Sequence, residues 1–132
     1  MNILFVCKHN RFRSKVAEAI FNKFNKNKEN YAESAGMILD DSRPYIEENV
    51  VNIMKEKSYD VSGIPKQINK SLAKNFDKIV IVADNVDKRF FNDFKGEVKI
   101  WKISDCDASD VKGIKKRVDE IEREVKFLLE TL

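Results

Sequence analysis

Residues that could carry out chemistry stand together near the start of the sequence. Cys7 and Arg13 are separated by five residues, and Ser14 follows directly. A thiolate is a strong nucleophile, and the planar guanidinium of arginine can bind two oxygens of a tetrahedral oxyanion at once. Lys8 and Arg11 add positive charge, which favours the thiolate over the thiol. The spacing therefore predicts a loop that curls around one anion and presents Cys7 to it.

The elements on either side of this loop should hold it in place. Ile3–Cys7 is a continuous apolar run, typical of a strand buried on both faces of a parallel sheet. Ser14–Asn25 carries apolar residues at spacings of three and four, which predicts a helix. A helix N-terminus and successive loop N–H groups both bind anions. We expect Asn10 to adopt a left-handed conformation and Ser14 to hydrogen-bond the sulfur.

Two structural explanations compete with this interpretation. A cysteine at a strand end is commonly a small buried hydrophobic residue, and basic residues that open a helix are commonly solvated. Against them, positive side chains are unfavourable at a helix N-terminus unless an anion binds there. The residues alone do not decide between these structural explanations and an oxyanion-binding loop, and we favour the loop.

The rest of the chain alternates between strand and helix patterns. Three further strands are predicted, at Tyr31–Ala35, Lys78–Ala83 and Val98–Ile103. Four further helices are predicted, at Pro44–Lys57, Lys66–Lys74, Val86–Phe94 and Val111–Leu132. This alternation implies a three-layer α/β fold, in which a four-stranded parallel sheet has helices on both faces. The last predicted helix carries a stripe of apolar residues at spacings of three and four. Such a stripe could also indicate a coiled coil, but it covers only about three heptads, which favours packing of the helix on its own sheet.

Composition narrows the function classes. Lys and Arg total 25 and Asp and Glu total 22, so the net charge of +3 is too small to suggest nucleic-acid binding. No apolar stretch approaches the roughly 20 residues of a membrane helix, and no signal-peptide pattern is present. Two distant cysteines and a single histidine argue against a disulfide framework and against a structural zinc site. We expect one domain over residues 1–132, cytoplasmic and monomeric, with reduced thiols and without metal or cofactor.

These motifs resemble the low-molecular-weight protein tyrosine phosphatase family, whose fold is shared with thioredoxin-coupled arsenate reductases. The resemblance begins with strand, Cys-x5-Arg-Ser and helix, with Asn10 three residues after Cys7. It continues through Ser34–Gly36 and Phe76–Val80 and covers essentially the whole chain. It implies a phosphocysteine intermediate, with Cys7 as nucleophile and Arg13 as the clamp on the transition state. The other loop residues are expected to bind the substrate: Lys8, His9, Asn10, Arg11, Phe12 and Ser14.

The resemblance also implies a general acid on the loop after the fourth strand. Asp105 fits this position best, with Cys106 where the family has proline. Asp107 and Asp110 are rivals, although Asp110 also suits the N-cap of the last helix. The acid must protonate the leaving oxygen and later activate water.

Three departures from the family pattern bear on the substrate, on protection of the nucleophile and on arsenate reduction. Asp107 and Ala108 stand where relatives often have an aromatic pair that frames an aromatic substrate. Phe12 replaces a second loop cysteine that protects the nucleophile as a disulfide in many relatives. Residues 83–90 contain no cysteine, so the triple-cysteine relay of the arsenate reductases cannot operate.

Three functions follow as hypotheses. The first is a phosphatase acting on a phosphorylated protein, with phosphotyrosine as the expected residue, or on a small phosphomonoester. The second is an arsenate reductase in which an external thiol resolves a Cys7–arsenate adduct. The third is a phosphate-binding module without catalysis. Cys106 could form a disulfide with Cys7 only if their Cα atoms lie within about 7 Å.

Overall fold

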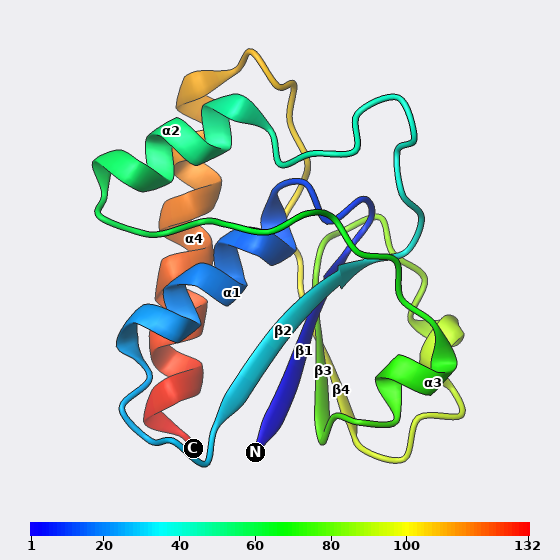
Figure 1. Ribbon diagram of the computed structural model, residues 1–132. Helices are drawn as coiled ribbons and strands as arrows, with labels where there is room; N and C mark the ends of the chain where they lie inside the picture. Colours follow the sequence, from blue (N-terminus) through cyan, green and yellow to red (C-terminus); the bar gives the residue numbers. More distant parts are fainter.

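Four parallel strands form the centre of the molecule, in the order β2-β1-β3-β4 (Figure 1). All three strand pairs are parallel. The computed structural model describes residues 1–132. The strands are β1 (Asn2–Cys7), β2 (Tyr31–Gly36), β3 (Lys78–Val82) and β4 (Glu97–Trp101). The predicted α/β fold with a four-stranded parallel sheet is confirmed.

Helices cover both faces of this sheet (Figure 1). Successive side chains of a strand point to opposite faces, so Ile3 and Phe5 of β1 enter one apolar core, whereas Leu4 and Val6 enter the other. The first core contains the buried faces of α1 (Arg13–Phe24), α2 (Glu48–Glu56) and α4 (Val111–Glu130). The second lies under the short α3 (Lys70–Ala73) and the 3₁₀ helix η1 (Lys88–Phe91). The three predicted layers are therefore present.

The last helix packs on its own sheet rather than in a coiled coil. Its buried residues follow the predicted stripe: Ile114, Val118, Ile121, Val125 and Leu128. They join the core that α1 also lines. Asp110 caps this helix by accepting a hydrogen bond from the Gly113 N–H at 2.9 Å. None of the helices combines the length and the apolar composition needed to cross a bilayer.

The helix predicted from Pro44 begins four residues later than expected, at Glu48. Long-range hydrogen bonds hold the preceding residues out of the helix. Arg11 Nε donates to the Tyr45 carbonyl at 2.8 Å, and the Glu47 N–H donates to the Arg11 carbonyl at 3.1 Å. The proline is therefore part of a loop that is fastened to the residues after β1.

Two other helices are shorter than predicted. The segment that begins at Lys66 first runs beside the end of β2, where the Gly36 N–H donates to the Lys66 carbonyl at 2.7 Å. Its helix therefore covers only Lys70–Ala73. The predicted helix Val86–Phe94 is reduced to the 3₁₀ helix η1, because Asp87 accepts the Arg89 N–H and starts a tight turn.

The carboxyl ends of the strands gather the residues of interest at one edge of the sheet. Cys7 ends β1, Gly36 ends β2, Asp84 follows β3 and Asp105 follows β4. Ligands of open parallel sheets bind at this edge. The topology alone thus places residues that are about 100 positions apart in the sequence around one site.

Candidate active site

The loop after β1 is shaped by the side chain of Asn10. This residue is fully buried and has a φ of 56°, which confirms the predicted left-handed conformation. Its Oδ1 accepts the Lys66 N–H at 3.0 Å, so its amide nitrogen faces the other way. From there Nδ2 donates to Ser14 Oγ at 2.7 Å and to Ser34 Oγ at 3.0 Å. Asn10 therefore connects the loop to α1 and β2.

The Cys7 sulfur lies at the base of this loop. The residue is 2 % exposed, and its Sγ lies 2.9 Å from Ser14 Oγ. Because the amide nitrogen of Asn10 can only donate, Ser14 accepts from it and can direct its own hydrogen to the sulfur.

The backbone of the loop presents a row of unpaired N–H groups. None of the amides from Lys8 to Lys15 donates to an acceptor in the protein, and the first helical bond runs from Val16 N–H to the Phe12 carbonyl. Most of these residues are buried. Such donors at the start of a helix can surround the oxygens of an oxyanion.

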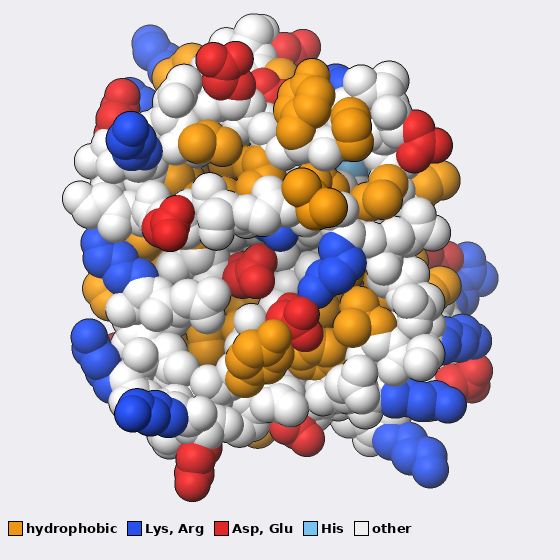
Figure 2. Space-filling model, in the orientation of Figure 1, with side chains coloured by type: hydrophobic (Ala, Val, Ile, Leu, Met, Phe, Trp, Pro, Cys, Tyr) orange, Lys and Arg blue, Asp and Glu red, His pale blue; other side chains and the backbone are white.

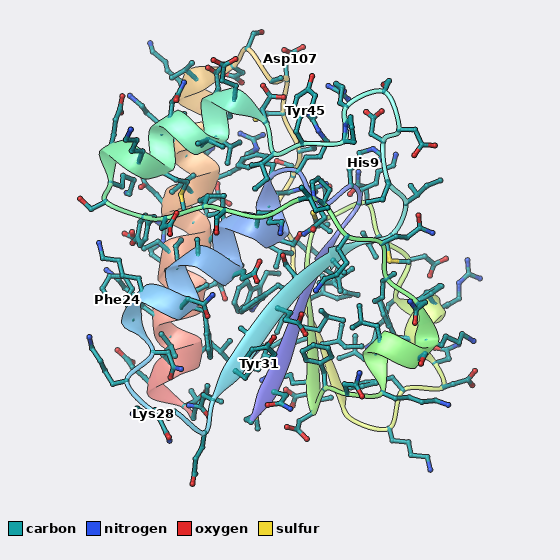
Figure 3. The ribbon with its side chains drawn as sticks, in the orientation of Figure 1. His9, Phe24, Lys28, Tyr31, Tyr45 and Asp107 are labelled. Atoms are coloured by element: carbon teal, nitrogen blue, oxygen red, sulfur yellow. The ribbon has the colours of Figure 1, made fainter.

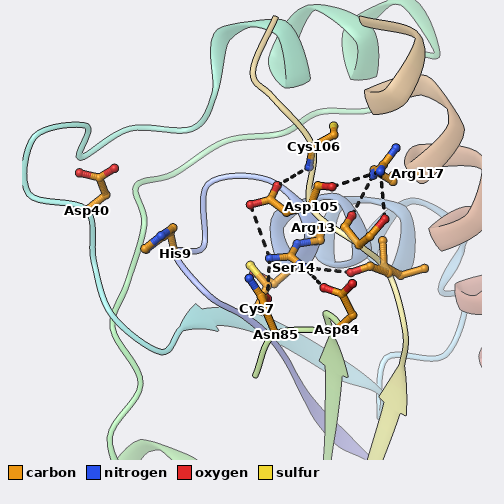
Figure 4. Close-up of polar contacts among 12 residues, drawn as sticks. Cys7, His9, Arg13, Ser14, Asp40, Asp84, Asn85, Asp105, Cys106 and Arg117 are labelled. Carbon is orange, nitrogen blue, oxygen red and sulfur yellow. Dashed lines mark hydrogen bonds and ion pairs between the residues drawn. The ribbon is translucent and has the colours of Figure 1, made fainter. Parts of the chain in front are cut away.

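Arg13 connects the loop to the ends of β3 and β4. Its side chain is 3 % exposed. Nη1 donates to the Ile103 carbonyl at 2.9 Å, and Nη2 donates to Asn85 Oδ1 at 3.1 Å. Two carboxylates flank it, Asp84 at 3.7 Å and Asp105 at 3.9 Å (Figure 4). These two hydrogen bonds use only two of its five N–H donors, so the guanidinium is fixed and can still bind an anion.

The three aspartates near the last helix have different surroundings. Asp107 accepts the N–H of Ser109 at 2.9 Å and its hydroxyl at 2.7 Å, which together hold the pKa of the Asp107 carboxyl below its usual range. Asp110 caps α4. Asp105 instead accepts only the adjacent Cys106 N–H, and its other oxygen faces Arg13. Of the three, Asp105 has the carboxylate oxygen that is nearest to the loop arginine and free of turn contacts.

Cys7, Arg13 and Asp105 line one small pocket of about 90 Å³. His9, Arg11, Phe12 and Cys106 contribute to the same walls. The remaining lining residues come from the Arg43–Val50 segment, the loop before α4 and the first turn of α4: Arg43, Glu47, Val50, Asp107, Ala108 and Ile114. His9, Tyr45 and Asp107 lie at this end of the molecule, whereas Lys28 and Tyr31 lie at the opposite end (Figure 3).

The other loop residues occupy different positions around the pocket. His9 and Phe12 line it, and His9 Nδ1 contacts the Ile38 carbonyl at 2.8 Å. Arg11 also lines it, but its Nη2 donates to Glu47 at 3.1 Å, so its charge is already paired. The Lys8 side chain is exposed and lies outside the pocket. Asn10 and Ser14 lie behind it and support the loop.

A model of the family described as low molecular weight phosphotyrosine protein phosphatase matches residues 2–132. The chain belongs to this family.

Solved structures resemble this family member over nearly its whole length. An arsenate reductase from Archaeoglobus fulgidus is 29 % identical with a TM-score of 0.78, and the match covers 97 % of this chain and 98 % of that one. A low molecular weight protein tyrosine phosphatase from T. tengcongensis is 26 % identical with a TM-score of 0.81, covering 100 % and 99 %. The YwlE arginine phosphatase from Geobacillus stearothermophilus is 18 % identical with a TM-score of 0.85, covering 98 % and 91 %, and supports the fold alone.

Several contacts of the site in this family member were not expected from the sequence. Ser34 accepts from Asn10 and donates to Glu18 Oε1 at 2.6 Å, and Asn85 accepts from Arg13. Ser34 and Asn85 could have been suspected, because each lies at or just beyond the carboxyl end of a predicted strand. Arg117, which contacts the Asp105 loop, carries no sequence signal, since it lies on an ordinary polar helix face.

Gly36 is required by the close approach of the loop after β1 to the end of β2. A Cβ at this position would lie 2.7 Å from the His9 carbonyl carbon and 2.8 Å from the Asn10 nitrogen, both of them backbone atoms. We expect Gly36→Ala to lower the free energy of unfolding by about 1–3 kcal/mol, because the loop must move. Urea denaturation with circular dichroism checks this prediction, and a midpoint equal to that of the unaltered chain would contradict it.

Proposed function

We propose that the protein is a phosphomonoester phosphatase that works through a phosphocysteine intermediate. The observation that carries the proposal is the position of Cys7. Its sulfur lines a pocket together with Arg13 and Asp105, at the base of the unpaired amides from Lys8 to Lys15. This arrangement provides a nucleophile, a charge clamp and a proton donor around one tetrahedral anion.

The first step transfers the phosphoryl group to sulfur. The phosphate oxygens bind the loop amides and the Arg13 guanidinium, which stabilise the charge of the transition state. The Cys7 thiolate attacks phosphorus, so an S–P bond forms while the bond from phosphorus to the ester oxygen breaks. Asp105 in its carboxylic acid form gives its proton to that leaving oxygen.

The second step releases inorganic phosphate. Asp105 is now a carboxylate, and it takes a proton from a water molecule as that water attacks phosphorus. The S–P bond breaks, and the electron pair returns to Cys7 as the thiolate that Ser14 can stabilise. Protonated Asp105 and the free thiolate are the starting state, so the cycle closes without a metal or a cofactor.

Phosphorylated proteins, and phosphotyrosine in particular, are the proposed substrates. Apolar side chains gather near His9 on the visible face (Figure 2), and exposed Ile38 and Tyr45 both belong to segments whose carbonyls contact the loop. The Tyr45 ring lies 5.3 Å from the guanidinium carbon of Arg11, which lines the pocket. Apolar groups at the mouth favour a peptide over a small polar phosphomonoester, and the tyrosine ring could pack against an aromatic leaving group. A phosphatase that depends on a free thiolate suits the reducing cytoplasm.

Arsenate reduction is the second candidate, and Cys106 is the observation that favours it. Arsenate has the shape and charge of phosphate, so the same loop can bind it. Attack by Cys7 would form an S–As bond and release water. An external thiol would then attack the Cys7 sulfur, giving a mixed disulfide and arsenite, and a second thiol would restore Cys7.

Cys106 lines the same pocket and could replace the first external thiol. Burial raises the pKa of its thiol, however, so it is a weak nucleophile at neutral pH.

One side-by-side experiment separates these candidates. Release of phosphate is measured with a phosphotyrosyl peptide, a phosphoarginine peptide and a small aliphatic phosphomonoester, and arsenite formation is measured with glutathione or thioredoxin. We expect the phosphotyrosyl peptide to give the highest kcat/KM and arsenate to give no thiol-dependent turnover. Arsenite formation without phosphate release would reverse the assignment. Binding of phosphate without either reaction would identify a non-enzymatic module.

A further inference from the structure

The loop that carries Asp105 is held by a single arginine from the last helix. Arg117 Nε donates to the Ser104 carbonyl at 2.8 Å, and its Nη2 donates to Ser104 Oγ at 2.9 Å and to the Asp105 carbonyl at 3.1 Å. Its remaining nitrogen, Nη1, donates to the Gly113 carbonyl at 3.0 Å, within the first turns of α4. Figure 4 shows Arg117 joined to this loop on the side away from Arg13. All three guanidinium nitrogens are therefore used, and the planar group ties the loop to the helix.

Little else fixes the backbone on either side of Asp105. Its side chain is 51 % exposed and is 3.9 Å from Arg13, which is longer than a hydrogen bond. The next residue is Cys106, which leaves φ free to vary where a proline would restrict it. Arg13 holds the loop upstream, at the Ile103 carbonyl, and Asn49 holds it downstream, at the Ala108 carbonyl. Arg117 is thus the only side chain from another element that holds the backbone of Ser104 and Asp105 themselves.

We propose that Arg117 is a positioning residue for the general acid, and that it fixes the Asp105 carboxyl at the distance needed to protonate the leaving oxygen. The inference rests on the proposed phosphatase function. A misplacement of about 1 Å can reduce a rate by about a hundredfold, so the geometry of this loop has a direct kinetic effect. Proton donation matters most when the leaving group is a poor one, and this dependence gives the proposal a specific signature.

The test measures kcat/KM for a series of aryl phosphates, from phenyl phosphate with a poor leaving group to 2,4-dinitrophenyl phosphate with a good one. Arg117→Lys keeps the charge but loses the planar fork of donors. We expect kcat/KM for phenyl phosphate to fall by about tenfold to a hundredfold, and kcat/KM for the dinitrophenyl ester to change by less than about threefold. The rate of Cys7 alkylation by iodoacetamide, followed on the Cys7 peptide by mass spectrometry, should be unchanged.

Three further variants make the result decisive. Arg123→Lys is the matched control, because Arg123 is an exposed arginine of the same helix without a polar contact, and it should leave the whole series unchanged. Ser104→Ala removes only one of the four acceptors of Arg117 and should give a weaker form of the same pattern if the lysine variant is unstable. In an Asp105→Asn background, Arg117→Lys should cause no additional loss for phenyl phosphate.

Equal losses for all leaving groups in Arg117→Lys, or losses that add to those of Asp105→Asn, would overturn the positioning role while leaving the proposed phosphatase function intact. Absence of aryl phosphate hydrolysis by the unaltered chain would overturn the proposed function and this inference with it. A series in which neither Arg117→Lys nor Ser104→Ala differs from the unaltered chain would also reject the role.

Discussion

Replacing the sulfur of Cys7 by oxygen is expected to abolish hydrolysis. We expect Cys7→Ser to lower kcat for p-nitrophenyl phosphate by about four orders of magnitude or more, as for other enzymes that lose their nucleophile. A serine hydroxyl at the base of the loop remains protonated near neutral pH, and no histidine or carboxylate contacts this position to deprotonate it. The change leaves the loop amides that would bind phosphate in place, so phosphate binding should persist. Release of p-nitrophenol measures the loss of hydrolysis.

The expected loss is specific to one of the two thiols. Serine is close to cysteine in size, so the melting temperature of Cys7→Ser should stay near that of the unaltered chain. Isothermal titration with inorganic phosphate separates loss of chemistry from loss of binding. Hydrolysis that survives in Cys7→Ser but disappears in Cys106→Ser would transfer the nucleophile to the other cysteine of the pocket.

Arg13→Lys is expected to have the second largest effect, a loss of about 100- to 1000-fold in kcat/KM. A lysine keeps the positive charge but cannot bind two oxygens in parallel. It would also give up hydrogen bonds to the Ile103 carbonyl and to Asn85, which join the loop to the ends of β4 and β3. The phosphate-release assay should therefore show a lower kcat as well as a higher KM.

A surface substitution of the same kind provides the comparison for Arg13→Lys. Arg123→Lys changes an exposed arginine and should not affect kcat/KM. If Arg13→Lys retained full activity, charge alone would be sufficient at this position and the proposed bidentate clamp would be wrong. A higher KM with unchanged kcat would restrict the role of the guanidinium to ground-state binding.

The sheet and its principal helices could be predicted because local pattern and final burial agree. The apolar runs of β1 and β3 are buried on both faces, and the stripe of α4 is the face that packs inward. The start of α2 could not be predicted. A proline such as Pro44 is a good first residue for a helix, but contacts from Arg11, more than thirty residues away in the sequence, hold Tyr45 and Glu47 outside it.

The site was predictable where one short segment contains all the information. The left-handed Asn10 and the contact between Ser14 and the sulfur of Cys7 both follow from residues within the loop. The resemblance already favoured Asp105 among the aspartates, but the sequence could not show that Asp107 and Asp110 are used by a local turn and a helix cap. The pairing of Arg11 with Glu47 was equally hidden, and a charge expected to attract the anion is partly neutralised as a result.

The unpaired amides between Lys8 and Lys15 have a consequence for the resting protein. An oxyanion that accepts hydrogen bonds from these amides binds the folded chain and not the unfolded one, because only folding brings the amides together. Binding therefore raises the free energy of unfolding, by an amount that grows with the logarithm of the anion concentration once that concentration exceeds Kd. Inorganic phosphate, the product of the proposed reaction, would then act in two ways in a cell: as a competitor that slows turnover and as a protectant against unfolding and proteolysis.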